Sequence, residues 1–180
     1  MNYNVTVIIF RVDVLHIYSA AGGVQVDYID VAQSFGIVRR RIQALVVEAC
    51  SDVNLTYSEF AFLMKLYTNE GCSQDGMADS LYLDKAVVTR VIKSLEEKNL
   101  LYREQDPGDR RLKRVFLTDE GKALEPMVHN IIRKLISYMA IGMDDKRVHL
   151  IMEGFYDISQ KLANASYEDV FGMKEARAIE

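Results

Sequence analysis

Cysteine and histidine are both rare in this chain of 180 residues. The two cysteines, Cys50 and Cys72, form no CxxC pair and no Cys/His spacing that could hold zinc, so neither a zinc fold nor a disulfide framework is expected. The three histidines, His16, His129 and His149, have no second ligand four residues away, which argues against a metal site. We therefore expect no metal, no required cofactor and a reducing, cytoplasmic compartment.

Long hydrophobic runs are also missing. The apolar stretch from Val5 to Tyr18 is interrupted by Arg11 and Asp13, and it is shorter than the roughly 20 residues of a membrane-spanning helix. Residues 1–4 carry no positive charge, which a signal peptide would need. The sequence contains no nucleophile elbow and no phosphate loop. We expect no membrane helix, no secretion and no enzymatic activity.

Positive charge is in deficit overall but concentrated locally. The 22 basic residues are outnumbered by 26 acidic ones, and the net charge of −4 argues against nonspecific coating of nucleic acid. Between Asp84 and Arg114, however, nine basic residues stand against six acidic ones. With 49% hydrophobic and 27% charged residues, the chain has the composition of a globular protein that carries one basic segment.

Residues 1–28 differ from the rest and form an N-terminal extension of unknown role. Val5, Val7 and Ile9 alternate as in a strand, and residues 20–23 read as a flexible break. Two interpretations remain open: a loosely attached arm, or a strand exchanged between two copies of the chain.

Amphipathic helices are predicted on both sides of the basic segment. Apolar residues recur at three- and four-residue steps over residues 29–50, and again over residues 119–165 in a long helix from near Asp119 and a final helix. These helices are more apolar than one small domain needs, so we expect them to pack against a second copy in a two-fold dimer. Residues 166–180 form a mixed tail.

Capping signals divide the segment between the outer helices. Thr56 with Glu59 is a capping box for a helix through Leu66, and Ser73 and Asp84 are N-caps for helices over residues 74–81 and 85–98. Two helices joined by a turn of about three residues are typical of a helix-turn-helix, in which the second helix enters the DNA major groove. The apolar stripe of that second helix consists of Val88, Val91, Ile92 and Leu95.

A β-hairpin is predicted after this helix. Residues 100–104 read as a strand, residues 106–109 as a turn and residues 113–117 as a basic return strand. The predicted fold class is therefore mainly α with a small β-hairpin wing (α+β). It places a winged helix-turn-helix core over residues 55–118 between N- and C-terminal dimerisation helices.

These residues resemble the multiple-antibiotic-resistance regulator (MarR) family over about Ile29 to Leu162. The resemblance rests on residues 84–101, followed at fixed distance by residues 106–111 (DPGDRR) and 117–121 (LTDEG). It implies a homodimer that regulates transcription by binding a pseudopalindromic double-stranded DNA operator. It further implies a repressor released by a small phenolic or anionic effector, or by cysteine oxidation.

Two features depart from the family pattern. The chain before Ile29 is longer and more apolar than is usual, and Asn99 stands where glycine is common. Asparagine tolerates the left-handed conformation that a helix C-terminus needs, so the second departure is benign.

The recognition helix supplies the first group of candidate DNA contacts. Polar side chains of its first turns should reach base edges, and Arg90 is the leading candidate because arginine binds guanine bidentately or holds a phosphate. Sequence does not separate these two roles, and a merely solvated helix face is the alternative. The residues assigned to DNA here are Lys85, Val88, Thr89, Arg90 and Lys93.

The wing and the third helix supply the second group. Asp109 and Arg111 look like the family arrangement in which a carboxylate orients the tip arginine toward the minor groove. Arg110 is a second tip candidate, whereas Lys113 and Arg114 are expected on phosphates or in solvent; an exposed hairpin without a ligand is the alternative. Ser73 and Gln74 start a helix whose amides either bind a phosphate or are simply capped.

The remaining candidates concern regulation. Tyr57, Phe60 and Tyr67 either line a small-molecule pocket or belong to the core. Cys50 and Cys72 are either redox-active or inert, and their positions do not match the reactive cysteine of the family's peroxide sensors. A winged-helix module that binds protein instead of DNA is the competing function.

Overall fold

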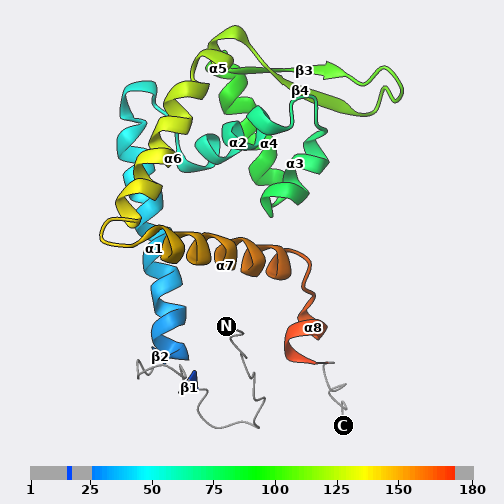
Figure 1. Ribbon diagram of the computed structural model, residues 1–180. Helices are drawn as coiled ribbons and strands as arrows, with labels where there is room; N and C mark the ends of the chain where they lie inside the picture. Colours follow the sequence, from blue (N-terminus) through cyan, green and yellow to red (C-terminus); the bar gives the residue numbers. More distant parts are fainter. Residues whose placement is uncertain (1–15, 18–25, 173–180) are drawn as a thin grey trace, which may run out of the picture. The chain divides into compact units, whose positions relative to one another are not determined.

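A computed structural model describes residues 16–17 and 26–172 (Figure 1). The chain divides into two compact units, residues 1–48 and 49–180. The strand-like alternation expected at Val5, Val7 and Ile9 and the break expected at residues 20–23 lie outside the described residues, as does the end of the tail.

The first unit is a short strand pair followed by a long helix. Strand β1 (His16–Ile17) pairs antiparallel with β2 (Val26–Asp27), and α1 spans Tyr28–Ala49. Asp27 starts the helix, because its Oδ1 accepts a hydrogen bond of 2.8 Å from the amide of Ile29. None of the helices among the described residues combines the length and the apolar character that crossing a bilayer demands.

The second unit holds a helical domain with one hairpin (Figure 1). Strands β3 and β4 are antiparallel, with Leu101 opposite Leu117 and Gln105 opposite Lys113. The predicted class, mainly α with a small hairpin wing, is confirmed. Its elements are η1 (Ser51–Val53), α2 (Tyr57–Thr68), α3 (Gln74–Leu81), α4 (Lys85–Glu97), β3 (Leu101–Gln105), β4 (Lys113–Leu117), α5 (Asp119–Ala123), α6 (Glu125–Met139), α7 (Asp145–Ala163) and α8 (Tyr167–Phe171).

The predicted N-caps at Thr56, Ser73 and Asp84 are present, and Thr118 caps the helix that follows the hairpin. Thr56 and Glu59 form a complete capping box, in which each side chain bonds the other residue's backbone amide, at 3.3 and 2.7 Å. Ser73, Asp84 and Thr118 each accept one amide hydrogen bond from the following turn. Asn99 takes the expected left-handed conformation at the end of α4, with φ of 56°.

One hydrophobic core joins the helices to the hairpin. Helices α2 and α4 each contribute four buried apolar side chains, and α4 packs against α2 and α3. The side chains with no measurable exposure include Phe62, Leu63, Leu66, Met77, Val88, Ile92, Leu95 and Val115.

The long helix predicted from Asp119 is two helices. Helix α5 ends at Ala123 and α6 begins at Glu125, with Leu124 between them. Pro126 explains the break, because proline has no N–H and cannot donate the hydrogen bond that would continue the first helix. The expectation of one uninterrupted helix was therefore wrong.

Gly121 allows α5 to lie against the start of the hairpin. A Cβ atom at this position would fall 2.0 Å from the carbonyl oxygen of Leu100 and 3.2 Å from a methyl group of Leu117. Only glycine permits so close an approach of a helix to backbone. The glycine of the LTDEG motif therefore has a packing role.

Candidate nucleic-acid interface

The recognition helix α4 separates its residues by face. Lys85, Thr89, Arg90 and Lys93 are exposed, as a groove-reading role requires. Val88 has no exposed surface and belongs to the core. Assigning Val88 to DNA was therefore wrong, because its position on the 3.6-residue repeat turns it toward the core rather than toward solvent.

The C-terminal end of α4 is fastened to α2 by a buried carboxylate. Glu59 is 2% exposed, and both its carboxylate oxygens lie 2.8 Å from the ammonium of Lys98, while Ser94 donates a further hydrogen bond of 2.6 Å. Burial alone would raise the pKa of Glu59, but the hydrogen bonds from Lys98, Ser94 and Thr56 together lower it below its usual value. A satisfied network thus fixes the recognition helix on the domain.

The wing is fixed to the same helix by a second ion pair. Arg103 on β3 makes a bidentate contact with Glu96 on α4, at 2.8 and 2.6 Å. The guanidinium of Arg103 is therefore paired with a carboxylate of the same domain. This contact sets the hairpin beside the recognition helix.

Arg114 anchors the loop end of the hairpin, a contact that the sequence did not predict. Its Nε pairs with Asp106, and its Nη1 donates a 2.8 Å hydrogen bond to the carbonyl of Gly71 in the loop before α3. The amide of Gly108, then Arg114, then the amide of Asp109 lower the pKa of Asp106. Arg114 was expected on phosphates or in solvent, but it joins the hairpin to that loop instead.

Backbone hydrogen bonds extend the hairpin sheet into that loop. The amide of Gly71 donates to the carbonyl of Val115 at 2.9 Å, and the amide of Val115 donates to the carbonyl of Cys72 at 3.0 Å. Ser73 forms an isolated bridge with Arg114. The wing and the helix-turn-helix are therefore continuous in hydrogen bonding.

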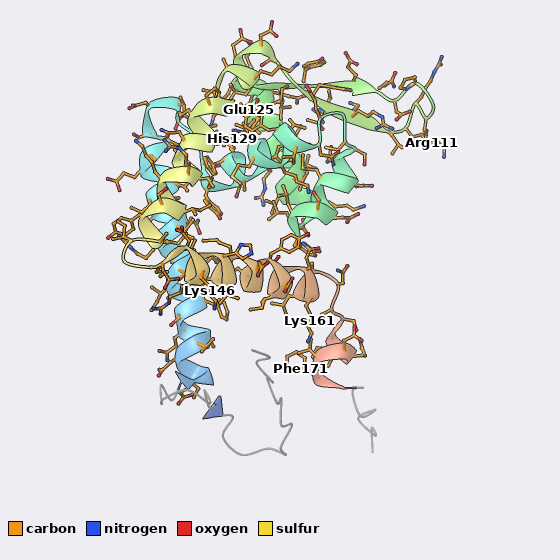
Figure 2. The ribbon with its side chains drawn as sticks, in the orientation of Figure 1. Arg111, Glu125, His129, Lys146, Lys161 and Phe171 are labelled. Carbon is orange, nitrogen blue, oxygen red and sulfur yellow. The ribbon has the colours of Figure 1, made fainter. Side chains whose placement is uncertain are left out.

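The wing tip presents its arginines to solvent. Arg111 lies on the loop that joins β3 and β4 (Figure 2). Asp109 bonds the backbone amide of Arg111 at 2.9 Å, so this carboxylate shapes the tip through the backbone. Arg110 and Lys113 are also exposed, and the carbonyl of Arg110 accepts a hydrogen bond from Gln105.

Helix α3 meets α4 through polar side chains at the N-termini of both helices. Lys85 pairs with Asp75 at 3.0 Å, and the Gln74 amide donates to the Thr89 hydroxyl at 2.6 Å. The Thr89 hydroxyl in turn donates to the carbonyl of Lys85. Ser73 caps α3, as one of its two interpretations required. Asp75 was missed, because its role depends on how two helices cross rather than on local spacing.

The ion pairs divide the basic residues between Asp84 and Arg114 into two groups. Five of the nine basic residues between Asp84 and Arg114 form ion pairs, including Lys93 with Glu97 at 3.7 Å. The other four have no acidic partner within the described part of the chain: Arg90, Arg110, Arg111 and Lys113. The unpaired positive charge thus lies on the recognition helix and the wing.

Two of the three aromatic residues considered for a pocket, Phe60 and Tyr67, take part in packing. Phe60 is 2% exposed and lies in the core. The Tyr67 hydroxyl donates to the carbonyl of Gly121 at 2.9 Å, and its ring meets His129 edge-on. Burial, with the nearby charge of Glu125, raises the pKa of Tyr67 to about 12. Tyr57 is half-buried.

The two thiols lie in surroundings that disfavour thiolate. Cys50 is fully buried, and burial raises its pKa. Burial also raises the pKa of Cys72, despite the opposing charges of Lys65 and Arg114. The raised pKa of each thiol argues against a reactive thiolate at either position. Over residues 16–17 and 26–172, no group of three or more His, Cys, Asp or Glu side chains is placed to hold a metal ion.

Two helices joined by a short turn, followed by a hairpin bonded back to them, define a winged helix-turn-helix domain. Residues 55–113 match the model of the MarR family. Over this domain the chain resembles the MarR family.

Individual relatives agree with this placement. The chain is 25% identical over 99 residues to the uncharacterized HTH-type transcriptional regulator YybA of Bacillus subtilis, a match that covers 55% of this chain and 66% of YybA. A MarR transcriptional regulator from Methanosarcina mazei superposes with a TM-score of 0.70 at 27% identity, covering 73% of this chain and 94% of that one.

A MarR family structure from Listeria monocytogenes, complexed with a 26mer DNA, also superposes with a TM-score of 0.70. At 21% identity, over 74% of this chain and 89% of that one, it shows a shared fold. The matches to the first three curated relatives cover 49 to 66% of those proteins' lengths.

Proposed function

We propose that this chain is a sequence-specific DNA-binding regulator of transcription, not an enzyme, and that it binds a pseudopalindromic operator as a homodimer. The observation that carries the proposal is the location of the four unpaired cations. Arg90 lies on the helix that a helix-turn-helix inserts into the major groove, and Arg110, Arg111 and Lys113 lie on the wing. The remaining basic residues of the segment are neutralised within the domain.

The proposed division of labour follows the chemistry of each position. Arg90 would read a guanine edge or hold a phosphate in the major groove, with Lys85, Thr89 and Lys93 around it. Arg111 would enter the narrow minor groove, whose negative potential attracts arginine. Capping leaves other α3 amides available to a phosphate near Gln74.

Unburied apolar surface on the C-terminal helices supports the homodimer. On α7, Leu150, Phe155, Ile158 and Leu162 are between 46 and 64% exposed. Phe171, which lies on α8 (Figure 2), is 72% exposed. Such a density of exposed large apolar side chains marks an interaction surface. A second copy with the same surface would bury it and would present two recognition helices to one operator.

Selection of DNA from a random duplex pool tests the proposal. The purified chain should enrich one two-fold-symmetric sequence, with half-sites about one helical turn apart, near 34 Å. Its affinity should fall steeply with salt. Recovery of an unenriched pool at every salt concentration would remove the proposal and favour the protein-binding module.

We also propose that a small phenolic or anionic effector releases the operator. Resemblance to the family is its only support, and the burial of Phe60 means that a pocket near α2 would involve Tyr57 and Tyr67 instead. Titration of the DNA complex with a panel of phenolic carboxylates tests this: release of DNA with a saturating dose response is expected. A complex indifferent to the whole panel would contradict it.

A further inference from the structure

The polar contacts between the first turns of α3 and α4 place one acidic side chain within the proposed DNA interface. Asp75 lies 3.0 Å from the ammonium of Lys85, and 59% of its side chain is exposed, against 69% for Lys85. The neighbouring hydrogen bond from Gln74 to Thr89 joins the first turn of α3 to the second turn of α4. The carboxylate is therefore held beside the first residue of the recognition helix.

A carboxylate at this position opposes binding to the DNA backbone. Nonspecific affinity comes from lysine and arginine contacts to phosphates, each of which releases condensed counterions. A lysine that keeps its own carboxylate partner adds no net positive charge and so releases none. Because N-terminal residues of a recognition helix lie deepest in the groove, Asp75 enters the interface together with Lys85.

We propose that Asp75 is a specificity-determining residue, which withholds Lys85 from the phosphates of DNA that lacks the operator sequence. This inference rests on the proposed function. In a loosely docked, nonspecific complex Lys85 stays with Asp75. In the closely fitted operator complex Lys85 exchanges Asp75 for a DNA acceptor, which is feasible because the pair is exposed and solvent-screened.

The Asp75→Asn variant keeps the side-chain shape and removes the charge. It should bind non-operator DNA more tightly, and the slope of log affinity against log salt should steepen by about 0.9, the value for one additional phosphate contact. The ratio of its affinity for non-operator DNA to that of the wild type should therefore shrink about 3.5-fold between 50 and 200 mM salt. The slope for operator DNA should stay unchanged, so discrimination between the two DNAs falls.

The experiment measures fluorescence anisotropy of two labelled duplexes over this salt range. One is the sequence that the wild type selects from a random pool, and the other is the same composition in shuffled order. Asp79→Asn is the matched control, because it removes the same charge from an exposed position one turn along α3 that forms no ion pair among the described residues. Thermal unfolding of each variant verifies that it is folded.

The double variant Asp75→Asn with Lys85→Gln decides the mechanism. If Asp75 acts through Lys85, the gain on shuffled DNA disappears in the Lys85→Gln background. An equal gain in that background, or an equal gain from Asp79→Asn, would overturn the inference in favour of general charge repulsion. If the wild type prefers its selected duplex and Asp75→Asn binds both duplexes as the wild type does, the inference is overturned but the proposed function stands. If the wild type shows no preference between the duplexes, the proposed function is overturned as well.

Discussion

Lys98 holds its ammonium group 2.8 Å from each carboxylate oxygen of Glu59, although the two residues are 39 positions apart. The pair joins the end of the recognition helix to the first turn of α2. The same ammonium bonds the carbonyl of Asn54 at 2.5 Å. The position of α4 is thus determined by a buried charge as well as by its apolar stripe.

Removal of Lys98 should destabilise the domain strongly. Lys98→Met leaves the carboxylate of Glu59 buried without a cation, and we expect the free energy of unfolding to fall by about 3 kcal/mol. Urea denaturation of both proteins measures this. Lys93→Met is the control, since its pair with Glu97 is exposed and should contribute less than about 0.5 kcal/mol. Equal losses in the two variants would contradict a special role for the buried pair.

Stability should depend on pH through Glu59 and Asp106. Both have a pKa below the unfolded value, so their stabilisation is complete above about pH 5 and is lost as pH falls through the folded pKa. The free energy of unfolding should therefore decrease toward about pH 3. In Glu59→Gln this decrease should be smaller, and the difference between the two proteins should narrow on acidification. If the free energy of unfolding falls equally with pH in the wild type and in Glu59→Gln, Glu59 does not contribute to the pH dependence of stability.

The wing loop should loosen when Asp106 is replaced. Its Oδ1 accepts hydrogen bonds from the amides of Gly108 and Asp109, at 2.7 and 3.1 Å, and its Oδ2 pairs with Arg114. In Asp106→Ala, amide hydrogen exchange over residues 108–112 should accelerate while the core helices stay protected. Glu104→Ala, an exposed position on β3, serves as control. Unchanged exchange in the loop would show that other contacts hold it.

Two glycine-to-alanine changes should have opposite effects. Gly121→Ala drives a Cβ into the Leu100 carbonyl, and we expect a loss of about 3 kcal/mol or more. Gly154→Ala, in α7 where no atom lies within 4 Å of the new Cβ, should be neutral or stabilise by up to about 1 kcal/mol. Thermal unfolding compares them. A tolerated alanine at 121 would mean that α5 can move away from β3.

Local signals in the sequence predicted the elements well, because helix starts depend on neighbouring residues. Ser73, Asp84 and Thr118 each accept the amide hydrogen bond that their residue type predicts. The break before Pro126 was missed, although its cause is equally local, because the prediction followed the apolar repeat that continues across it.

The site was predicted less completely, because contacts between elements depend on tertiary packing. Sequence located Arg90 and Arg111 on the recognition helix and the wing, but not which cations are neutralised. The pairs of Arg114 with Asp106, and of Lys85 with Asp75, span distances along the chain that no repeat reveals. Val88 was assigned both to the apolar stripe and to DNA, and only its burial decides between them.

The most direct test of the account compares Arg90→Ala and Arg111→Ala with Arg133→Ala, which removes the same charge from an exposed position on α6. On the selected operator, each interface variant should lose about 10- to 100-fold in affinity, whereas Arg133→Ala should bind as the wild type does. Equal affinities for all four proteins would contradict the proposal that the unpaired arginines of α4 and the wing bind DNA.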